Sequence, residues 1–322
     1  MCPPNHLTAR PDVHANKKEA EHYHDITADL SSFRNEAQQQ WTSLKGHFKT
    51  VGAQVSAVPL SAGTTDQTYT ADPAFTLVND DLERIYIVAS QFSNAHRNAE
   101  VQTFLTHLKS IFSSHPIYKD YECCVHHMKT SFEGTGDNIY DPYRDLIFSG
   151  YTTHLGKNDP SQGRSSITSH QTLSEVTGVA VISLEVQHPC FHIDTCLGFL
   201  PDGPALVYRA GMTENAFKNL QQKAFKDFGL DPTKCIIEVT QNEAENHFVT
   251  NLVCIGNTVF IPHFGNGNYE PVRPAFKTQL SALGYDIKWT DMSAFIKVGG
   301  AVHCTSHLLH HRVLGGLLRK EK

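Results

Sequence analysis

The sequence predicts one α/β domain, and three observations favour this class. Apolar, strand-like runs such as 84–90 and 179–186 alternate with amphipathic, helix-like stretches such as 99–112 and 213–229. No Pro- or Ser-rich linker divides the 322 residues. Hydrophobic residues make up 40% of the chain, which is enough for a sizeable core. We therefore expect residues 1–322 to form a single domain.

The first fifty residues (1–50) are expected to form a helical extension packed on this domain. Residues 17–49 lack proline and carry spaced apolar side chains, which predicts helix in one or two pieces. The stretch 53–60 is strand-like and leads into a loop rich in Thr and Asp. A buried strand over 84–90 and a helix over 99–112 should follow.

The alternation continues to the C-terminus. Turn signals at 201–204 and 256–257 predict two hairpins, and Thr213, Gly178 and Gly229 are typical helix caps. Further strands and helices are expected, in chain order, at 145–151, 169–178, 179–186, 213–229, 235–240, 275–284 and 285–291.

Composition excludes several classes of function. The formal charge is −6, and no basic stripe points to nucleic acid or to a membrane surface. No apolar run approaches the roughly 20 residues of a membrane span. The polar N-terminal stretch is no signal peptide, so we expect a cytoplasmic protein whose eight cysteines are mostly free. A homo-oligomer remains possible.

Twenty histidines raise the question of a metal. His307, His310 and His311 have helical spacing and His126 adjoins His127, but no HExxH or CxxC pattern is present, so we expect no metal site. No GxGxxG follows a strand, and no GxxxxGK[ST] occurs, so nucleotide binding is not expected either.

Three stretches combine titratable side chains with turn residues: FEGTGD (132–137), FHIDTCL (191–197) and VGGAVHCTS (298–306). The carboxylates of the first could be ordinary turn residues. In the second, His192 and Asp194 share one face if the segment is a strand, where they could pair. In the third, Cys304 could be a small buried hydrophobe, although the preceding glycines allow close backbone approach.

Together these stretches supply a complete set of groups for nucleophilic chemistry. Cys304 is the candidate nucleophile, His192 the candidate acid–base group, and Glu133 and Asp194 the candidate carboxylates. A free thiol is only a few per cent ionised at neutral pH, and a nearby imidazole or substrate cation raises that fraction. Such a thiol suits attack on a trigonal carbon.

The three stretches resemble, in order and spacing, the amidinotransferase and guanidino-modifying superfamily, the penteins. Its patterns are E/D-G-x-G-D, H-x-D-[TA] and G-G-G-x-H-C; here they fall at Glu133–Asp137, His192–Thr195 and Gly299–Cys304, with Ala301 for the third glycine. The resemblance is to members such as dimethylarginine dimethylaminohydrolase and arginine deiminase. It implies an α/β propeller of five ββαβ-type units around a central site, and catalysis without a cofactor.

The resemblance also implies a mechanism. Cys304 attacks the guanidino or ureido carbon of an arginine-like amino acid, and a covalent adduct forms as amine or ammonia leaves. His192 protonates the leaving nitrogen and then activates water. Glu133, with Asp194 and Asp137, is expected to hold the substrate nitrogens.

One departure concerns the substrate head group. Relatives place an acidic residue or Asn two or three positions after the Phe, but here Leu77 and Val78 follow Phe75, and the polar Asn79 and Asp80 come later. Either the loop shifts so that Asn79 or Asp80 reaches a guanidinium, or the head group is a neutral ureido group, as in citrulline.

The role of Arg97 and the type of activity stay open at the level of sequence. Arg97 matches the Arg that follows this loop in relatives and is expected to bind a substrate carboxylate, or it is a surface residue at a helix start.

Three alternatives to a hydrolase stay open at the level of sequence. An amidinotransferase differs only in that an amine, and not water, attacks the adduct. A catalytically silent pentein that binds ligands would not need the Cys–His–Glu set. A papain-like peptidase normally places Cys before His, whereas His192 precedes Cys304 here.

Overall fold

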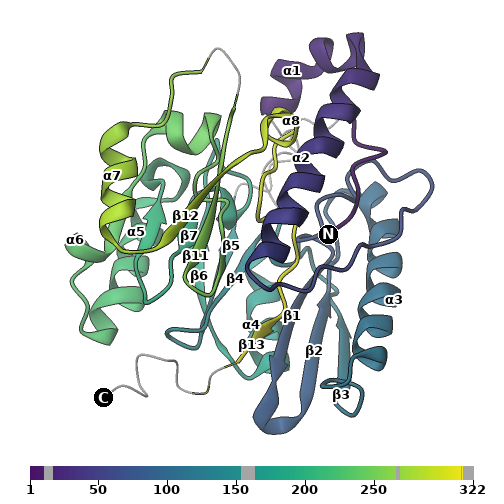
Figure 1. The fold of residues 1–322 in the computed structure, drawn as a ribbon. Coiled ribbons are helices and arrows are strands. Elements are labelled where there is room, and N and C mark those ends of the chain that lie inside the picture. Colours follow the sequence, from purple (N-terminus) through teal and green to yellow (C-terminus); the bar gives the residue numbers. More distant parts are fainter. Residues whose placement is uncertain (11–16, 154–163, 266–268, 313, 315–322) are drawn as a thin grey trace.

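The computed structural model of the chain describes residues 1–10, 17–153, 164–265, 269–312 and 314. Helices and short strands alternate along it, so the predicted α/β class is confirmed (Figure 1). No described helix combines the length and the apolar character needed to cross a membrane.

Four units of the same design follow one another in the described residues. In each, two antiparallel strands are followed by a helix and by a third strand that runs parallel to the second. A parallel neighbour needs such a crossover connection, which explains why a helix stands before each third strand. The units are β1 (Ala74–Asn79), β2 (Arg84–Ala89), α3 (Asn98–Ser114), β3 (Glu122–His127); β4 (Asn138–Asp141), β5 (Leu146–Tyr151), α4 (Ile167–Thr177), β6 (Ala180–Glu185); β7 (Leu197–Phe199), β8 (Ala205–Val207), α5 (Glu214–Leu220), β9 (Ile236–Glu238); and β10 (Val253–Ile255), β11 (Thr258–His263), α7 (Pro274–Ala282), β12 (Asp286–Asp291).

A last short strand, β13 (His310–His311), joins the first sheet beside β1 and runs parallel to it. The C-terminal part of the chain therefore returns to the sheet that opens the series of units. The described residues contain these four sheets, and the fifth unit of the predicted propeller stays a prediction.

Local sequence signals account for the two predicted helix boundaries at Thr213 and Gly178. Thr213 caps α5 by accepting a hydrogen bond from the Ala216 N–H, and Gly178 ends α4 at φ 66°, a left-handed conformation that favours glycine. Beyond α5 the helical path to Gly229 continues as a π-helical turn and a 3₁₀ turn, and α6 (Pro232–Cys235) precedes β9.

Two kinds of sequence prediction failed. The strand expected at 53–60 is absent, because this extended segment has no neighbouring strand to pair with among the described residues. The segment 192–195, expected at a strand end, forms a 3₁₀ turn, Ile193–Thr195. Strands β1, β3, β4 and β13 had no counterpart in the sequence analysis.

The predicted N-terminal helices are α1 (Lys17–Ala28) and α2 (Leu30–Thr50). Asp29 separates them and caps α2 through the Ser32 N–H. Figure 1 shows both beside the short helix α8 (Ser293–Lys297). The apolar face of α2 and the residues around α8 form one buried cluster, which includes Trp41, Leu44, Phe48, Phe260 and Phe295.

Candidate active site

The site is built from segments that lead into the first strand of each unit. Asp72 precedes β1, Glu133 precedes β4, and the His192–Asp194 turn precedes β7. Asn251 precedes β10, and Cys304 lies between α8 and β13. Equivalent positions of a repeated unit thus bring polar side chains from distant parts of the sequence to one place.

Two glycines of the EGTGD stretch make this convergence possible. Gly134 has φ +42°, and a Cβ there would overlap the carbonyl oxygens of Ala71, Asp72 and Ala74. At Gly136 a Cβ would overlap the Asp72 carboxylate and the His192 ring. The interpretation of this stretch as a turn is therefore correct, and the same turn also holds Glu133 in the site.

His192 lies in a buried cluster of carboxylates. Its Nε2 is 2.9 Å from Glu133 Oε2, and its Nδ1 is 3.8 Å from Asp72 Oδ1. Burial by itself lowers the pKa of His192, but the charges of Asp137 and Asp72 and the bond to Glu133 outweigh it and raise the pKa to about 9. At neutral pH His192 is an imidazolium, the form that can protonate a leaving group.

Glu133 remains ionised despite complete burial. Burial raises its pKa, yet the neighbouring Arg164 guanidinium and His192 reverse this and lower the pKa to about 2. Arg164 Nη1 is 3.1 Å from Glu133 Oε2. For Asp137 burial prevails and raises the pKa to about 7. The Asp137 Oδ1 atom accepts a hydrogen bond from the Ile193 N–H.

Cys304 is held by an amide and a carboxylate. Asn251 donates from Nδ2 to Sγ at 3.1 Å and accepts from the Cys304 N–H at 3.2 Å. Sγ lies 3.4 Å from Asp194 Oδ2, which it contacts as a donor. Burial, followed by the charges of Asp194 and Asp72, raises the pKa of the thiol well above its usual value. In these surroundings the sulfur therefore carries its proton.

Several buried polar atoms of the site have no hydrogen-bond partner among the described residues: Asp72 Oδ1, Asp194 Oδ1, His192 Nδ1 and Arg164 Nε. An unsatisfied buried polar group costs about 1–3 kcal/mol. Two of these atoms are carboxylate oxygens near the sulfur, so the arrangement fits a ligand that offers several N–H donors.

A small cavity of about 40 Å³ connects these groups with the N-terminal helices. Cys304, His192, Asp72, Arg97 and Arg164 line it, and its remaining walls include Glu19, Asp66, Tyr69, Asn94, Phe191, Val298 and Gly299. Burial, with the charge of Asp66, raises the pKa of Glu19 to about 8. The N-terminal helices thus contribute an acidic residue to the candidate site.

Asp72, Glu133 and His192 also have donor atoms within 4.8 Å of one another, as a bound cation would require. Both carboxylates already pair with guanidinium groups, Asp72 with Arg97 at 2.7 Å and Glu133 with Arg164. A protonated His192 also has no lone pair to offer a metal ion.

The chain was compared with known protein families, sequences and solved structures. No protein-family model matches the chain. It is 29% identical to an uncharacterized protein of Caenorhabditis elegans, over 84% of this chain and 82% of that protein. It is 25% identical to the N(G),N(G)-dimethylarginine dimethylaminohydrolase of Mycobacterium tuberculosis, over 89% of this chain and 79% of the enzyme.

A bifunctional arginine dihydrolase/ornithine cyclodeaminase of Nostoc is 26% identical over 94% of this chain, which spans 36% of that enzyme. Among solved structures, the N-terminal domain of the cyanobacterial arginine dihydrolase ArgZ, bound to its substrate, has a TM-score of 0.77 at 22% identity and covers 97% of this chain and 98% of that one. A dimethylarginine dimethylaminohydrolase has a TM-score of 0.61 at 15% identity, over 84% and 88% of the two chains. The chain thus resembles arginine-modifying members of the pentein superfamily in sequence and in fold.

The candidate site brings together most of the residues predicted to carry chemistry. Cys304, His192 and Arg97 line one cavity, and Glu133 and Asp137 adjoin His192. Asp194 also belongs to the site, because its Oδ2 atom contacts the sulfur of Cys304. The pairing of His192 with Asp194, considered for a strand, does not form: the segment is a 3₁₀ turn, and Asp194 lies 2.9 Å from His303 Nδ1 instead.

The predicted head-group residues lie elsewhere in the structure. Phe75, Leu77 and Val78 are fully buried in apolar clusters around β1. Asn79 caps a 3₁₀ turn through the Leu82 N–H, and Asp80 lies 2.7 Å from His311. None of the five lines the cavity beside Cys304, and their contact with a substrate stays a prediction.

Sequence reasoning missed four polar residues that the structure places at the site: Asp72, Arg164, Asn251 and His303. Asp72 directly precedes Pro73 at the start of β1, and a search for polar residues upstream of Phe75 could have found it. His303 stands in the recognised VHC stretch but received no role. Arg164 and Asn251 carry no local signal.

Proposed function

We propose that this protein is a cysteine-dependent hydrolase of the side-chain guanidino group of an arginine-like amino acid. The observation that carries the proposal is a pair of carboxylate oxygens, Asp72 Oδ1 and Asp194 Oδ1, that accept no hydrogen bond from the described residues and belong to residues next to the protonated Cys304. A planar guanidinium offers N–H donors to both in charge-assisted hydrogen bonds. The named relatives, which modify arginine or methylated arginine, support the same class.

The Asp72 carboxylate favours a guanidino over a ureido substrate. The ureido hypothesis arose because Leu77 and Val78 replace a carboxylate in the sequence. Asp72 supplies a buried carboxylate from a different position, so a cationic head group has its partner. The hydrogen bond from Arg164 to Glu133 further supports a cationic head group, because it shows that a carboxylate of this cluster can bind a guanidinium. A ureido substrate such as citrulline is the second candidate.

The reaction then follows from the protonation states. A bound cation lowers the proton affinity of the thiol, which releases its proton to solvent, and the thiolate attacks the guanidino carbon. The His192 imidazolium donates its proton to the leaving nitrogen as the C–N bond breaks. Neutral His192 takes a proton from water, which attacks the covalent adduct and frees Cys304. If an amine replaced water in this last step, the protein would be an amidinotransferase.

Arg97 is buried, with its guanidinium bound to Asp72 and Glu100. These contacts hold Asp72 in place beside His192. The predicted contact of Arg97 with a substrate carboxylate stays a prediction, and Arg164, whose Nε has no partner among the described residues, is a second candidate for that contact.

The proposal is tested by product analysis. Purified protein is incubated with arginine, a methylated arginine or citrulline, and released ammonia, methylamine, ornithine and citrulline are quantified. Turnover of a guanidino substrate, lost in Cys304→Ser and retained in the matched variant Cys123→Ser at an exposed cysteine, is the expected result. Preference for citrulline would replace the guanidino proposal with the ureido one. Adduct formation that needs an added amine for turnover would indicate a transferase.

A further inference from the structure

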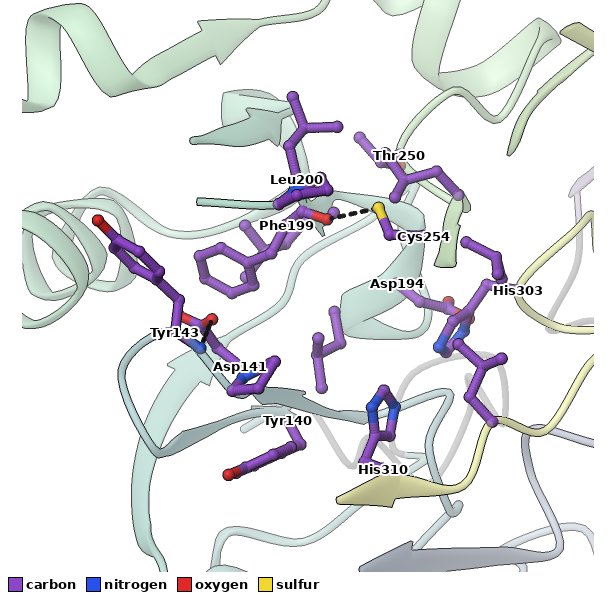
Figure 2. A pocket seen from close by; sticks show the side chains of 18 of the residues that line it. Tyr140, Asp141, Tyr143, Asp194, Phe199, Leu200, Thr250, Cys254, His303 and His310 are labelled. Atoms are coloured by element: carbon purple, nitrogen blue, oxygen red, sulfur yellow. Dashed lines mark hydrogen bonds and ion pairs between the residues drawn. The ribbon is translucent and has the colours of Figure 1, made fainter. Parts of the chain in front are cut away.

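A second, larger cavity of about 370 Å³ lies next to the candidate active site. Tyr140, Phe199, Leu200 and Cys254 are among its walls, and Asp194 and His303 close one side of it (Figure 2). Cys304 and His192 do not line this cavity; they line the small one. Asp194 and His303 therefore separate the larger cavity from the sulfur.

Two donors meet on one oxygen at this partition. Asp194 Oδ2 accepts from Cys304 Sγ at 3.4 Å, and His303 Nδ1 lies 2.9 Å from the same atom. The His303 backbone N–H donates to the carbonyl oxygen of Asn251, and the side chain of Asn251 holds the sulfur. The His303 side chain is 13% exposed, whereas Asp194 is 1% exposed.

The charge of Asp194 acts directly on the thiol. A carboxylate in contact with a sulfur disfavours the thiolate, because two negative charges repel in a poorly solvated site. An N–H donor to that carboxylate draws part of its charge away from the sulfur. His303 is the titratable side chain that contacts Asp194 from the side opposite the catalytic cavity.

We infer that His303 is a positioning residue for the Cys304 nucleophile, acting through its hydrogen bond to Asp194. It holds the carboxylate against the sulfur and offsets its charge, so that the thiol ionises more readily than it would beside Asp194 alone. This inference rests on the proposed function, in which Cys304 is the nucleophile.

The charged and titratable groups around this pair lie on several elements. His307 and His310 face His303 from the segment around β13, and burial lowers their pKa values to about 3 and about 4, so both are neutral at neutral pH. Asp141 lines the larger cavity but is paired with Arg144. Asp202 also lines it, and Asp72 faces Cys304 from the other side.

The inference is tested by the rate at which iodoacetamide, a neutral reagent, alkylates Cys304, followed by peptide mass spectrometry across pH. His303→Leu removes the donor, and His303→Asn retains an N–H close to the position of Nδ1. We expect the Leu variant to react about tenfold more slowly at pH 8, with its pH midpoint about one unit higher, and the Asn variant to stay within about threefold of the unsubstituted protein.

His310→Asn is the matched control, since His310 lines the same cavity without a described hydrogen bond to Asp194. It should react like the unsubstituted protein. Equal rates in His303→Leu and the unsubstituted protein would overturn the inference, as would an Asn variant as slow as Leu, or a control as slow as Leu.

Chemical rescue gives a second test. In His303→Ala the removed ring leaves a space that adjoins the larger cavity, so free imidazole can reach Asp194. Imidazole should restore the alkylation rate of His303→Ala and leave His310→Ala unchanged; absence of rescue in a variant that melts like the unsubstituted protein contradicts the inference. Because alkylation does not require turnover, loss of the proposed hydrolase activity would leave both tests interpretable.

Discussion

At the scale of single residues, the site depends on which carboxylate each titratable group meets. His192 faces Glu133 and Asp72, whereas Cys304 faces Asp194. The first set favours a charged imidazole, and the second favours a neutral thiol. In the proposed mechanism, the imidazolium is the acid for the leaving group, and the neutral thiol becomes the nucleophile when a cation binds.

Cys304→Ser is expected to abolish turnover of a guanidino substrate while leaving the melting temperature within a few degrees, because the change is nearly isosteric. Activity assays and thermal melts of the variant, with Cys123→Ser alongside, provide the measurement. Substantial residual turnover in Cys304→Ser would remove this cysteine from the role of nucleophile.

Asp72→Asn should lower kcat/KM for a guanidinium substrate at least about a hundredfold, because a buried cation loses a charged partner worth several kcal/mol. Asp80→Asn is the matched variant: Asp80 is exposed, contacts His311, and should leave kcat/KM nearly unchanged. The reverse ranking would restore the shifted-loop hypothesis, in which Asp80 holds the substrate.

The pKa of His192 is raised from 6.5 to about 9, and this determines the direction in which activity and stability change with pH. As the acid, it must be protonated, so kcat/KM should fall as pH rises through about 9. Its pairing contributes folding stability that is fully present below about pH 6.5 and is lost as pH rises through about 9.

Glu133→Gln should lower the overall rate at least about a hundredfold and move the alkaline limb of the kcat/KM profile to lower pH, because the variant loses the carboxylate that stabilises the His192 imidazolium. An unmoved limb would assign it to another group.

At the scale of elements, the loops before the first strands decide the site, and their glycines permit the approach. Gly136→Ala places a methyl group against Asp72 and His192, whereas the Cβ of Gly178→Ala at the end of α4 meets only Arg312 at 3.5 Å. The two substitutions therefore separate the requirements of the site from those of a helix end.

Gly136→Ala should abolish activity more than it destabilises the fold. Gly178→Ala should retain activity and cost about 1–2 kcal/mol of stability, the cost of a left-handed conformation for a residue with a Cβ. Urea unfolding and kcat/KM measured on both variants provide the test. Full activity in Gly136→Ala would show that the cluster can rearrange.

At the scale of the whole molecule, the N-terminal helices are part of the same buried structure as the site. Leu44 of α2 is completely buried in the cluster that also contains Phe295 and Cys304, and Glu19 of α1 lines the catalytic cavity. This packing agrees with the expected extension, and unfolding measurements can test whether it forms a single domain with the rest.

Leu44→Ala should cost about 2–5 kcal/mol, the usual range for such a truncation in a core, and lower the midpoint of one cooperative transition. Gln39→Ala, on the exposed face of α2, should have little effect. Two separate transitions, with only the first shifted by Leu44→Ala, would show that residues 1–50 fold independently.

Local patterns in the sequence determined the alternation of helices and strands, the helix caps at Thr213 and Gly178, and the chemical types at Cys304, His192, Glu133 and Asp194. These properties depend on side-chain periodicity and on short motifs. Only the tertiary structure decided the partners: Glu133 rather than Asp194 beside His192, His303 beside Asp194, and Asp72 near His192 Nδ1. Those contacts join loops of different units, and their formation depends on how the sheets pack, which neither periodicity nor spacing along the chain encodes.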